Sequence, residues 1–129
     1  MLTIPLKKGK SNCFYVKVFI FQKEEIFLID TGFSSYLCLS ENLKFLFPDL
    51  DNYSTFDTDF TLADSSKKTF TQYLIPELSI FNTKLKNILV TFNQDESIIG
   101  NKLLSLLNAN LNINYQNMNG NLTLFSNNL

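Results

Sequence analysis

The sequence predicts a single domain that is mostly β-structure, with one short helix near its C-terminal end. Most of the chain consists of short runs rich in aliphatic and aromatic residues, and polar turn segments separate these runs, which is typical of strands. Leucines at helical spacing indicate a helix after residue 100. The length of 129 residues suffices for one hydrophobic core but is short for two lobes, so residues 1–129 are expected to fold as one unit.

The N-terminal part of the chain is expected to form three strands. Residues 2–6 indicate a short strand, and residues 9–12 indicate a turn. Residues 13–21 form a long β-rich run, which a polar turn at 22–25 joins to a returning strand at 26–29. This last run has no polar alternation, which is typical of a strand that is buried on both faces. The two runs are therefore predicted to pair as a hairpin.

The middle of the chain is predicted to hold a strand, a short helical segment and a loop. Residues 35–39 indicate the strand. Residues 40–47 indicate one or two helical turns, capped by Ser40 and ended by Pro48. The polar residues 49–57 are expected to form a solvated loop.

The remainder of the chain is predicted to consist of hairpins and a helix. The expected strands are residues 58–63, 69–75, 77–81, 87–92, 111–115 and 121–125, and the expected turns are residues 64–68, residues 82–84 and the Asn119-Gly120 pair. A helix is expected to begin at Asn101. Four leucines would give it an apolar face: Leu103, Leu104, Leu106 and Leu107.

The composition excludes several classes of function. The formal net charge is −1 and no basic stripe is present, so nucleic acid is not an expected partner. The chain has no histidine, which excludes Ser-His and Cys-His nucleophile pairs and the common zinc sites, and we expect no metal and no other cofactor. The four glycines form no phosphate-binding motif. Carboxylates are the groups that remain for acid–base chemistry.

No segment of the sequence predicts export or insertion into a membrane. Residues 1–8 lack the apolar core of a signal peptide, and no run approaches the roughly 20 apolar residues of a membrane span. We therefore expect a cytoplasmic location and no membrane partner. Cys13 and Cys38 lie in apolar, strand-like runs, which favours two buried free thiols over a disulfide.

The apolar run 26–29 ends abruptly at an acid, Asp30, which Thr31 and Gly32 follow. A glycine at this place indicates a sharp turn after the strand. An acid at a buried strand end must be hydrogen-bonded, paired or protonated, because burying an isolated charge is very unfavourable. Either Asp30 carries the chemistry of the protein, or the triplet is an Asp-Gly type of turn between two strands and has no function.

The triplet Asp30-Thr31-Gly32, with two aliphatic residues before it, resembles the active-site loop of retropepsin-like (retroviral-type) aspartic proteases. Further along the chain, Ile98-Ile99-Gly100 and the helix after it resemble a second motif of this family, in the same order and at a similar spacing. The resemblance implies a closed, β-barrel-like single lobe with a flap hairpin and a short C-terminal helix. It also implies a two-fold homodimer that acts as an aspartic endopeptidase on a peptide or protein substrate.

The resemblance assigns roles to individual residues. Asp30 would be the catalytic acid, and a water molecule would be activated between the two Asp30 carboxylates of a homodimer. The residues implied to support the active-site loop are Thr31, Gly32 and Ser34. Those implied on the flap and substrate side are Phe33, Ala63, Asp64 and Ser65. Those implied in the core beneath the loop are Ile98, Ile99 and Gly100.

Two positions depart from the pattern of the family. Phe33 follows the glycine, where a small residue such as alanine or serine is usual, and Ser65 stands near the flap tip, where glycine is usual. These departures motivate an alternative, a catalytically inactive dimerisation or peptide-binding module with the same fold. A third interpretation is an unrelated all-β structural protein in which residues 30–32 are only a turn.

Overall fold

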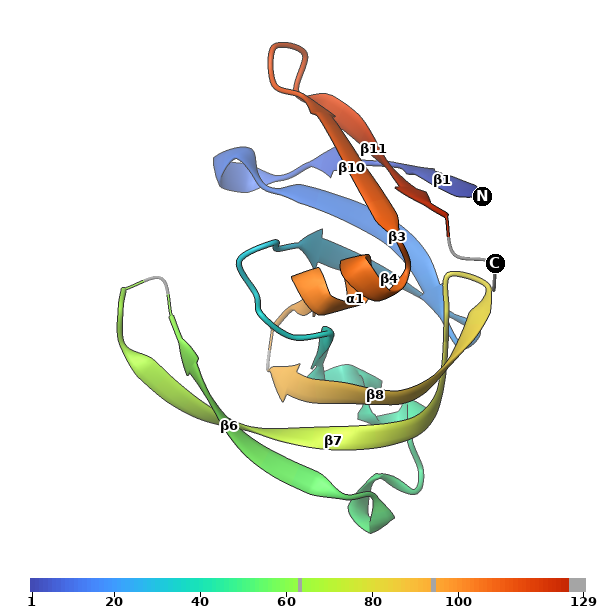
Figure 1. The fold of residues 1–129 in the computed structure, drawn as a ribbon, viewed down its shortest axis with the longest axis vertical. Helices are drawn as coiled ribbons and strands as arrows, with labels where there is room; N and C mark the ends of the chain where they lie inside the picture. The colour runs from blue at the N-terminus through green and yellow to red at the C-terminus, as the bar shows by residue number, and fades with distance from the viewer. Residues whose placement is uncertain (63, 94, 126–129) are drawn as a thin grey trace.

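The computed structural model describes residues 1–62, 64–93 and 95–125, and these are mostly β-structure (Figure 1). The strands are β1 (Leu2–Pro5), β2 (Lys7–Lys8), β3 (Phe14–Ile20), β4 (Lys23–Ile29), β5 (Leu37–Ser40), β6 (Thr55–Thr61), β7 (Lys67–Ile80), β8 (Thr83–Asn93), β9 (Ser97–Ile99), β10 (Ala109–Asn114) and β11 (Asn119–Leu124). The helical segments are α1 (Asn101–Leu106) and the 3-10 turns η1 (Lys10–Asn12), η2 (Glu41–Leu46) and η3 (Leu50–Asn52). A mostly β chain with a short helix near its C-terminal end is therefore confirmed.

The described strands form two sheets. The larger sheet has the strand order β2-β3-β4-β9-β5-β8-β7-β6, and the smaller sheet has the order β1-β11-β10 (Figure 1). β4 and β9 run parallel, with Ile29 opposite Ile99. The Asp30-Thr31-Gly32 motif, which follows Ile29, therefore lies next to the Ile98-Ile99-Gly100 motif. β3 also pairs with β7 through Ile20 and Ile80, which links distant strands of the larger sheet. A fully closed, barrel-like lobe stays a prediction.

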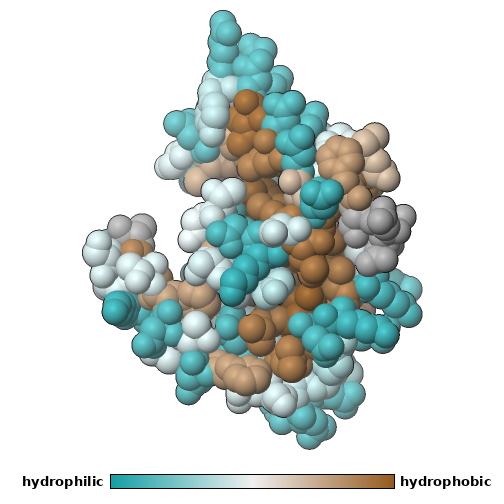
Figure 2. Space-filling view, in the orientation of Figure 1, coloured by the Kyte–Doolittle hydropathy of each residue, from teal (hydrophilic) through white to brown (hydrophobic). Residues whose placement is uncertain are grey.

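The hydrophobic core lies between the larger sheet, α1 and the smaller sheet. Side chains alternate along β3, where Val16 and Ile20 are completely buried, and α1 adds Leu103, also completely buried. Burial of an aliphatic side chain of this size contributes roughly 1.5 to 3 kcal/mol, so this core holds the sheets in place. Figure 2 shows an apolar band over the region of β10, α1 and β8, and it shows the β6–β7 hairpin standing away from the body.

β4 is longer and more exposed than the sequence predicts. It begins at Lys23, inside the predicted turn 22–25, because the ladder with β3 continues to this residue. Phe27 is completely buried, but Ile26 is 52% exposed because it shares the outward face of the strand with Glu24. The prediction of a strand that is buried on both faces is therefore wrong.

The segment after β5 forms 3-10 turns in place of a capped helix. Ser40 makes no side-chain capping hydrogen bond to η2. It belongs to β5 instead, and its backbone N–H donates a hydrogen bond of 2.9 Å to Oγ of the buried Ser97. The predicted loop 49–57 contains η3 and the first residues of β6. Sheet pairing therefore determines the conformation of Ser40.

β7 is one continuous strand of 14 residues, whereas the sequence predicts separate runs at 69–75 and 77–81. Pro76 lies between these runs and has no ladder partner among the described residues. The opposite residue, Asn87, has a φ of 58°, so the ladder passes the proline through a local irregularity of β8. The first half of this long strand forms one arm of the β6–β7 hairpin.

The C-terminal hairpin turns at residues 115–118 and not at the predicted Asn119-Gly120 pair. Asn119 and Gly120 are the first residues of β11, where they pair with β10. Gly120 is required by a close approach of the two strands, since a Cβ atom there would lie 2.2 Å from the carbonyl oxygen of Asn112.

α1 begins at Asn101, as predicted, and it buries Leu103 and Leu104. Leu107 follows the helix and is also buried, but Leu106 is 50% exposed and does not belong to the apolar face. The helix is six residues long. No helix in the described parts of the chain is long and apolar enough to cross a membrane.

Candidate active site

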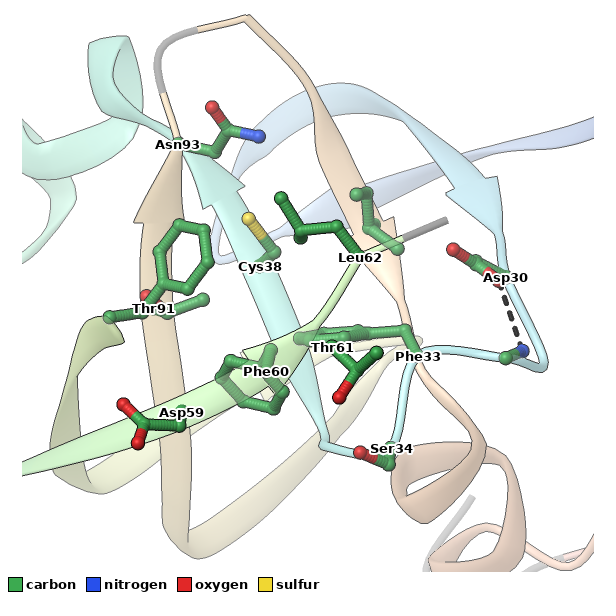
Figure 3. A pocket seen from close by; sticks show the side chains of 13 residues that line it. Asp30, Phe33, Ser34, Cys38, Asp59, Phe60, Thr61, Leu62, Thr91 and Asn93 are labelled. Carbon is green, nitrogen blue, oxygen red and sulfur yellow. Dashed lines mark hydrogen bonds between the residues drawn. The ribbon is translucent and has the colours of Figure 1, made fainter. Parts of the chain in front are cut away.

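Asp30 directly follows β4 and begins a tight loop. Its backbone N–H donates to the carbonyl of Ile99 at 3.0 Å, which extends the β4–β9 pairing by one residue. The N–H of Phe33 donates to the carbonyl of Asp30 at 3.1 Å and closes the turn. The carboxylate oxygen Oδ1 accepts a hydrogen bond from the N–H of Gly32 at 3.0 Å (Figure 3). Asp30 is half-buried, and its other carboxylate oxygen has no partner within the described chain.

The start of α1 supports this loop. Three backbone N–H groups donate to loop carbonyls at 3.0 to 3.1 Å: Gly100 to Tyr36, Asn101 to Phe33 and Lys102 to Ser35. The side-chain nitrogen Nδ2 of Asn101 also donates to the carbonyl of Thr31 at 3.2 Å. The first N–H groups of a helix have no partners inside the helix. The loop therefore satisfies them and is held in place by them.

Ile99 and Gly100 fit closely beneath the loop. Ile99 is completely buried. A Cβ atom at Gly100 would lie 2.3 Å from the carbonyl oxygen of Ser35 and 2.7 Å from Cδ2 of Phe33, so this position accepts no side chain. Ile98 is half-buried and lines the cavity described next. The structure thus brings the two predicted motifs together.

A cavity of about 590 Å³ lies between the Asp30 loop and the β6–β7 hairpin (Figure 3). The loop lines one side of it, the hairpin lines another, and residues of β5, β8 and β9 complete the walls. The lining includes Asp30, Phe33, Cys38, Phe60, Leu62 and Ile98. This volume falls in the usual range for ligand-binding pockets. The cavity can therefore hold several side chains of a ligand next to Asp30.

Three aromatic rings form a row along this cavity. The ring centroids of Phe33 and Phe60 are 5.4 Å apart, and those of Phe60 and Phe70 are 5.8 Å apart. The row connects the Asp30 loop to both arms of the hairpin. The sequence indicated Phe33 but neither Phe60 nor Phe70. In the sequence of β6, Phe56, Thr58 and Phe60 alternate with Asp57 and Asp59, and this alternation is the signal that could have found Phe60.

The tip of the β6–β7 hairpin contains the predicted flap residues Asp64 and Ser65, while Ala63 lies outside the described residues. Oδ1 of Asp64 accepts hydrogen bonds from the hydroxyl and the backbone N–H of Ser66, and these bonds hold the pKa of Asp64 below its ordinary value. Ser65 has a φ of 68°, in the left-handed region that favours glycine. The serine thus occupies a conformation in which glycine would be less strained.

Thr31 and Ser34 make no hydrogen bond to the carboxylate of Asp30 within the described residues. Both residues are exposed, and Figure 3 shows the side chain of Ser34 pointing away from Asp30. Gly32 lies closer, since a Cβ atom there would be 3.3 Å from Oδ1 of Asp30. The role predicted for Thr31 requires a second subunit, so the roles of Thr31 and Ser34 stay predictions.

Cys38 lines the cavity, which the sequence did not indicate. The side chain is buried, and burial together with the carboxylate of Glu96 raises the pKa of its thiol to about 12. The thiol is therefore neutral near pH 7 and unsuited to act as a nucleophile. Both cysteines are free, but only Cys38 is buried, so the prediction of a buried thiol is wrong for the half-buried Cys13.

In this β lobe, the loop that carries Asp30 rests on the Ile98-Ile99-Gly100 segment and faces the β6–β7 hairpin across a cavity. This arrangement is the architecture of the retropepsin-like fold. The structure is similar to the crystal structure of a retropepsin-like aspartic protease from Rickettsia conorii, with a TM-score of 0.65 and 21% sequence identity. The match covers 94% of this chain and 89% of that chain. No protein-family model and no curated protein sequence matches the chain. The similarity shows a retropepsin-like fold.

Proposed function

We propose that the protein is an aspartic endopeptidase that hydrolyses peptide bonds as a homodimer, with Asp30 of each subunit as the catalytic acid. The position of Asp30 carries this proposal, because its carboxylate borders the cavity beneath the hairpin and is oriented by the N–H of Gly32. The similarity of the fold to a retropepsin-like aspartic protease supports the same conclusion.

A second acid is needed because one carboxylate cannot both accept the proton of water and protonate the substrate. The other acid that lines the cavity, Asp59, accepts a hydrogen bond from Thr69, and Figure 3 shows it on the opposite side from Asp30. A two-fold dimer would repeat every contact residue across its axis and so would place a second Asp30 beside the first.

The proposed reaction uses one ionised and one protonated carboxylate. The ionised carboxylate takes a proton from water, the resulting hydroxide attacks the carbonyl carbon, and the protonated acid donates its proton to the carbonyl oxygen. A proton then passes to the amide nitrogen, and the C–N bond breaks to give a carboxylic acid and an amine. Two adjacent ionised carboxylates repel each other, which favours the singly protonated pair.

The substrate that suits this cleft is an extended peptide. Residues 67–70 of β7 pair with β6 but not with β8 in the described chain, so one edge of this arm can pair with another extended segment. Closer to the base, the carbonyl of Thr71 already accepts a hydrogen bond from the hydroxyl of Thr91. A second hollow of about 450 Å³ follows this edge and shares Phe70, Thr91 and Asn93 with the first cavity. Together the two hollows offer room for several consecutive residues of a peptide.

A pepstatin-type inhibitor, which mimics the tetrahedral state of the reaction, tests the proposed site. It is expected to raise the Tm of the wild type but not that of Asp30→Asn. Ligand at a hundredfold excess over its Kd stabilises a protein by about 2.7 kcal/mol, which is measurable by thermal unfolding. Both proteins must have similar Tm values and the same oligomeric state without inhibitor. Equal shifts in the two proteins, or no shift in the wild type, would contradict the proposal.

Phe33→Ala is expected to enlarge the cavity and to shift peptide preference toward larger apolar side chains. The change removes the ring contact with Phe60, and loss of this half-buried side chain is expected to lower the free energy of unfolding by about 1 to 2 kcal/mol. Cleavage of a peptide library by the wild type and the variant measures the preference. Phe56→Ala is the matched control, because Phe56 is 50% exposed and does not line the cavity. Identical cleavage profiles for wild type and Phe33→Ala would contradict this assignment.

A second candidate is a peptide-binding or dimerisation module without catalytic activity. The contact between Phe33 and Phe60 favours it, because the ring of Phe33 occupies space near Asp30 that a small residue would leave open. A folded dimer that binds peptides equally well in the wild type and in Asp30→Asn, and that cleaves none of them, would support this candidate.

A further inference from the structure

Gln72 lies where the β6–β7 hairpin leaves the body of the larger sheet. The ladder between β7 and β8 begins with the pair Tyr73–Val90, whereas the ladder between β6 and β7 continues to the pair Thr61–Lys67. Residues 67–72 therefore have a ladder partner on one side only within the described chain. A segment that is held on one side opens more easily than one held on both. The position of the hairpin thus depends on the contacts at its base.

The side chain of Gln72 makes two hydrogen bonds at this base. Its Nε2 donates to Oγ of Ser35 at 2.8 Å, and its Oε1 accepts from the hydroxyl of Thr58 at 3.1 Å. Gln72 and Ser35 are each 4% exposed. Leaving a buried amide without its partner is costlier than the net gain of an average hydrogen bond. This one amide therefore ties β6 and β7 to Ser35.

Ser35 belongs to the loop that carries Asp30. Its carbonyl accepts the N–H of Lys102 at 3.1 Å, and the same carbonyl lies against Gly100, where a Cβ atom would be 2.3 Å away. Ser35 therefore cannot shift without disturbing the contacts between the loop and α1. The hydrogen bond from Gln72 fixes the base of the hairpin relative to this loop.

We infer that Gln72 is a positioning residue that sets where the β6–β7 hairpin stands relative to Asp30. The coupling between hairpin and loop is a property of the fold, and only its catalytic consequence rests on the proposed function. A peptide held between the hairpin and the loop contacts both, so a displaced hairpin binds it less tightly. Gln72 does not line the cavity, so its loss acts on peptide binding through the hairpin and not on the reacting groups. Loss of the bond is therefore expected to raise KM more than it lowers kcat.

Hydrogen–deuterium exchange tests the coupling without any need for activity. Gln72→Met and Ser35→Ala each remove the bond, and methionine keeps most of the volume of the glutamine side chain. In each variant the protected amides of residues 56–61 and 67–71 are expected to exchange roughly two- to tenfold faster than in the wild type, the factor that one net hydrogen bond corresponds to. The amides of β3 are expected to be unchanged. Gln72→Met also removes the bond from Thr58, whereas Ser35→Ala leaves that bond in place. The double variant is therefore expected to exchange no faster than Gln72→Met alone, since that variant already lacks the bond to Ser35.

Ser97→Ala is the matched control. Ser97 is also a buried serine, with hydrogen bonds to Ser40 and Glu25, but it lies outside the hairpin. Its loss is expected to lower the Tm without a selective change in hairpin exchange. Unchanged hairpin exchange in Gln72→Met, or the same selective acceleration in Ser97→Ala, would overturn the inference.

Kinetics of peptide cleavage test the catalytic consequence in the same variants. KM is expected to rise by roughly two- to tenfold in Gln72→Met and in Ser35→Ala, with kcat within about twofold of the wild type. A fall in kcat at constant KM would contradict the positioning role. Selective acceleration of hairpin exchange, with no cleavage by any protein including the wild type, would refute the proposed function and leave the coupling standing.

Discussion

Asp30→Asn is expected to abolish peptide cleavage, with kcat lower by on the order of a thousandfold or more. An amide neither accepts the proton of water nor donates one as an acid, and in a homodimer the substitution removes both acids. The fold is expected to persist, because asparagine keeps an oxygen that can accept the hydrogen bond from the N–H of Gly32. Steady-state cleavage of a diverse peptide library at about pH 4 to 7 provides the measurement.

Asp57→Asn is the matched control for this experiment. Asp57 is an exposed acid of β6 that accepts a hydrogen bond from Thr71 and does not line the cavity. Its replacement is expected to leave cleavage close to the wild-type rate. Full activity in Asp30→Asn, with both variants folded, would rule out Asp30 as the catalytic acid.

Gly100→Ala is expected to lower the stability markedly for a single added methyl group. The new Cβ atom would lie 2.3 Å from the carbonyl oxygen of Ser35, so the backbone of the loop or of α1 must move. Overpacking of this kind lowers the free energy of unfolding by about 1 to 3 kcal/mol. The corresponding fall in Tm is roughly 4 to 12 °C for a domain of this size. Cleavage is expected to fall as well, because the displaced loop carries Asp30.

Gly9→Ala is the control for the added methyl group. The Cβ atom at Gly9 would meet only the ring of Tyr15, which can rotate or shift more easily than a backbone carbonyl. Thermal unfolding is expected to show a smaller fall in Tm than for Gly100→Ala. Equal losses in the two variants would mean that the backbone contact of Gly100 with Ser35 is not what makes this position intolerant.

The centre of the candidate site could be predicted from short stretches of sequence because its geometry is local. Asp30 and Gly32 are two residues apart, so the turn that joins the carboxylate to the N–H of Gly32 is encoded within one triplet. Gly100 was implied by the resemblance to a known family, and the structure gives the physical reason for it, since only glycine permits so close an approach of two backbones. The parallel pairing of β4 with β9 could not be derived from either strand alone. Resemblance to a known family implied only that Ile98, Ile99 and Gly100 lie beneath the loop.

The walls of the cavity could not be predicted, because they depend on contacts between distant segments. Phe60 and Phe70 reach Phe33 only when the hairpin has folded against the loop. Gln72 has polar neighbours in the sequence, and no local pattern marks it as buried. The prediction for Ile26 was wrong in the opposite direction, since this residue was expected to be buried. A continuous apolar run predicts two buried faces, whereas the outward face of β4 leaves Ile26 52% exposed.

In the proposed homodimer, catalysis requires one Asp30 from each of two subunits. The most direct test adds an equal amount of Asp30→Asn protein to a fixed amount of wild type and allows the subunits to exchange. About a quarter of all dimers are then wild-type homodimers, so cleavage is expected to fall to roughly half of its value before the addition. Cleavage that stays unchanged or rises after complete exchange would contradict this requirement, because one Asp30 in a monomer, or in a mixed dimer, would then suffice for hydrolysis.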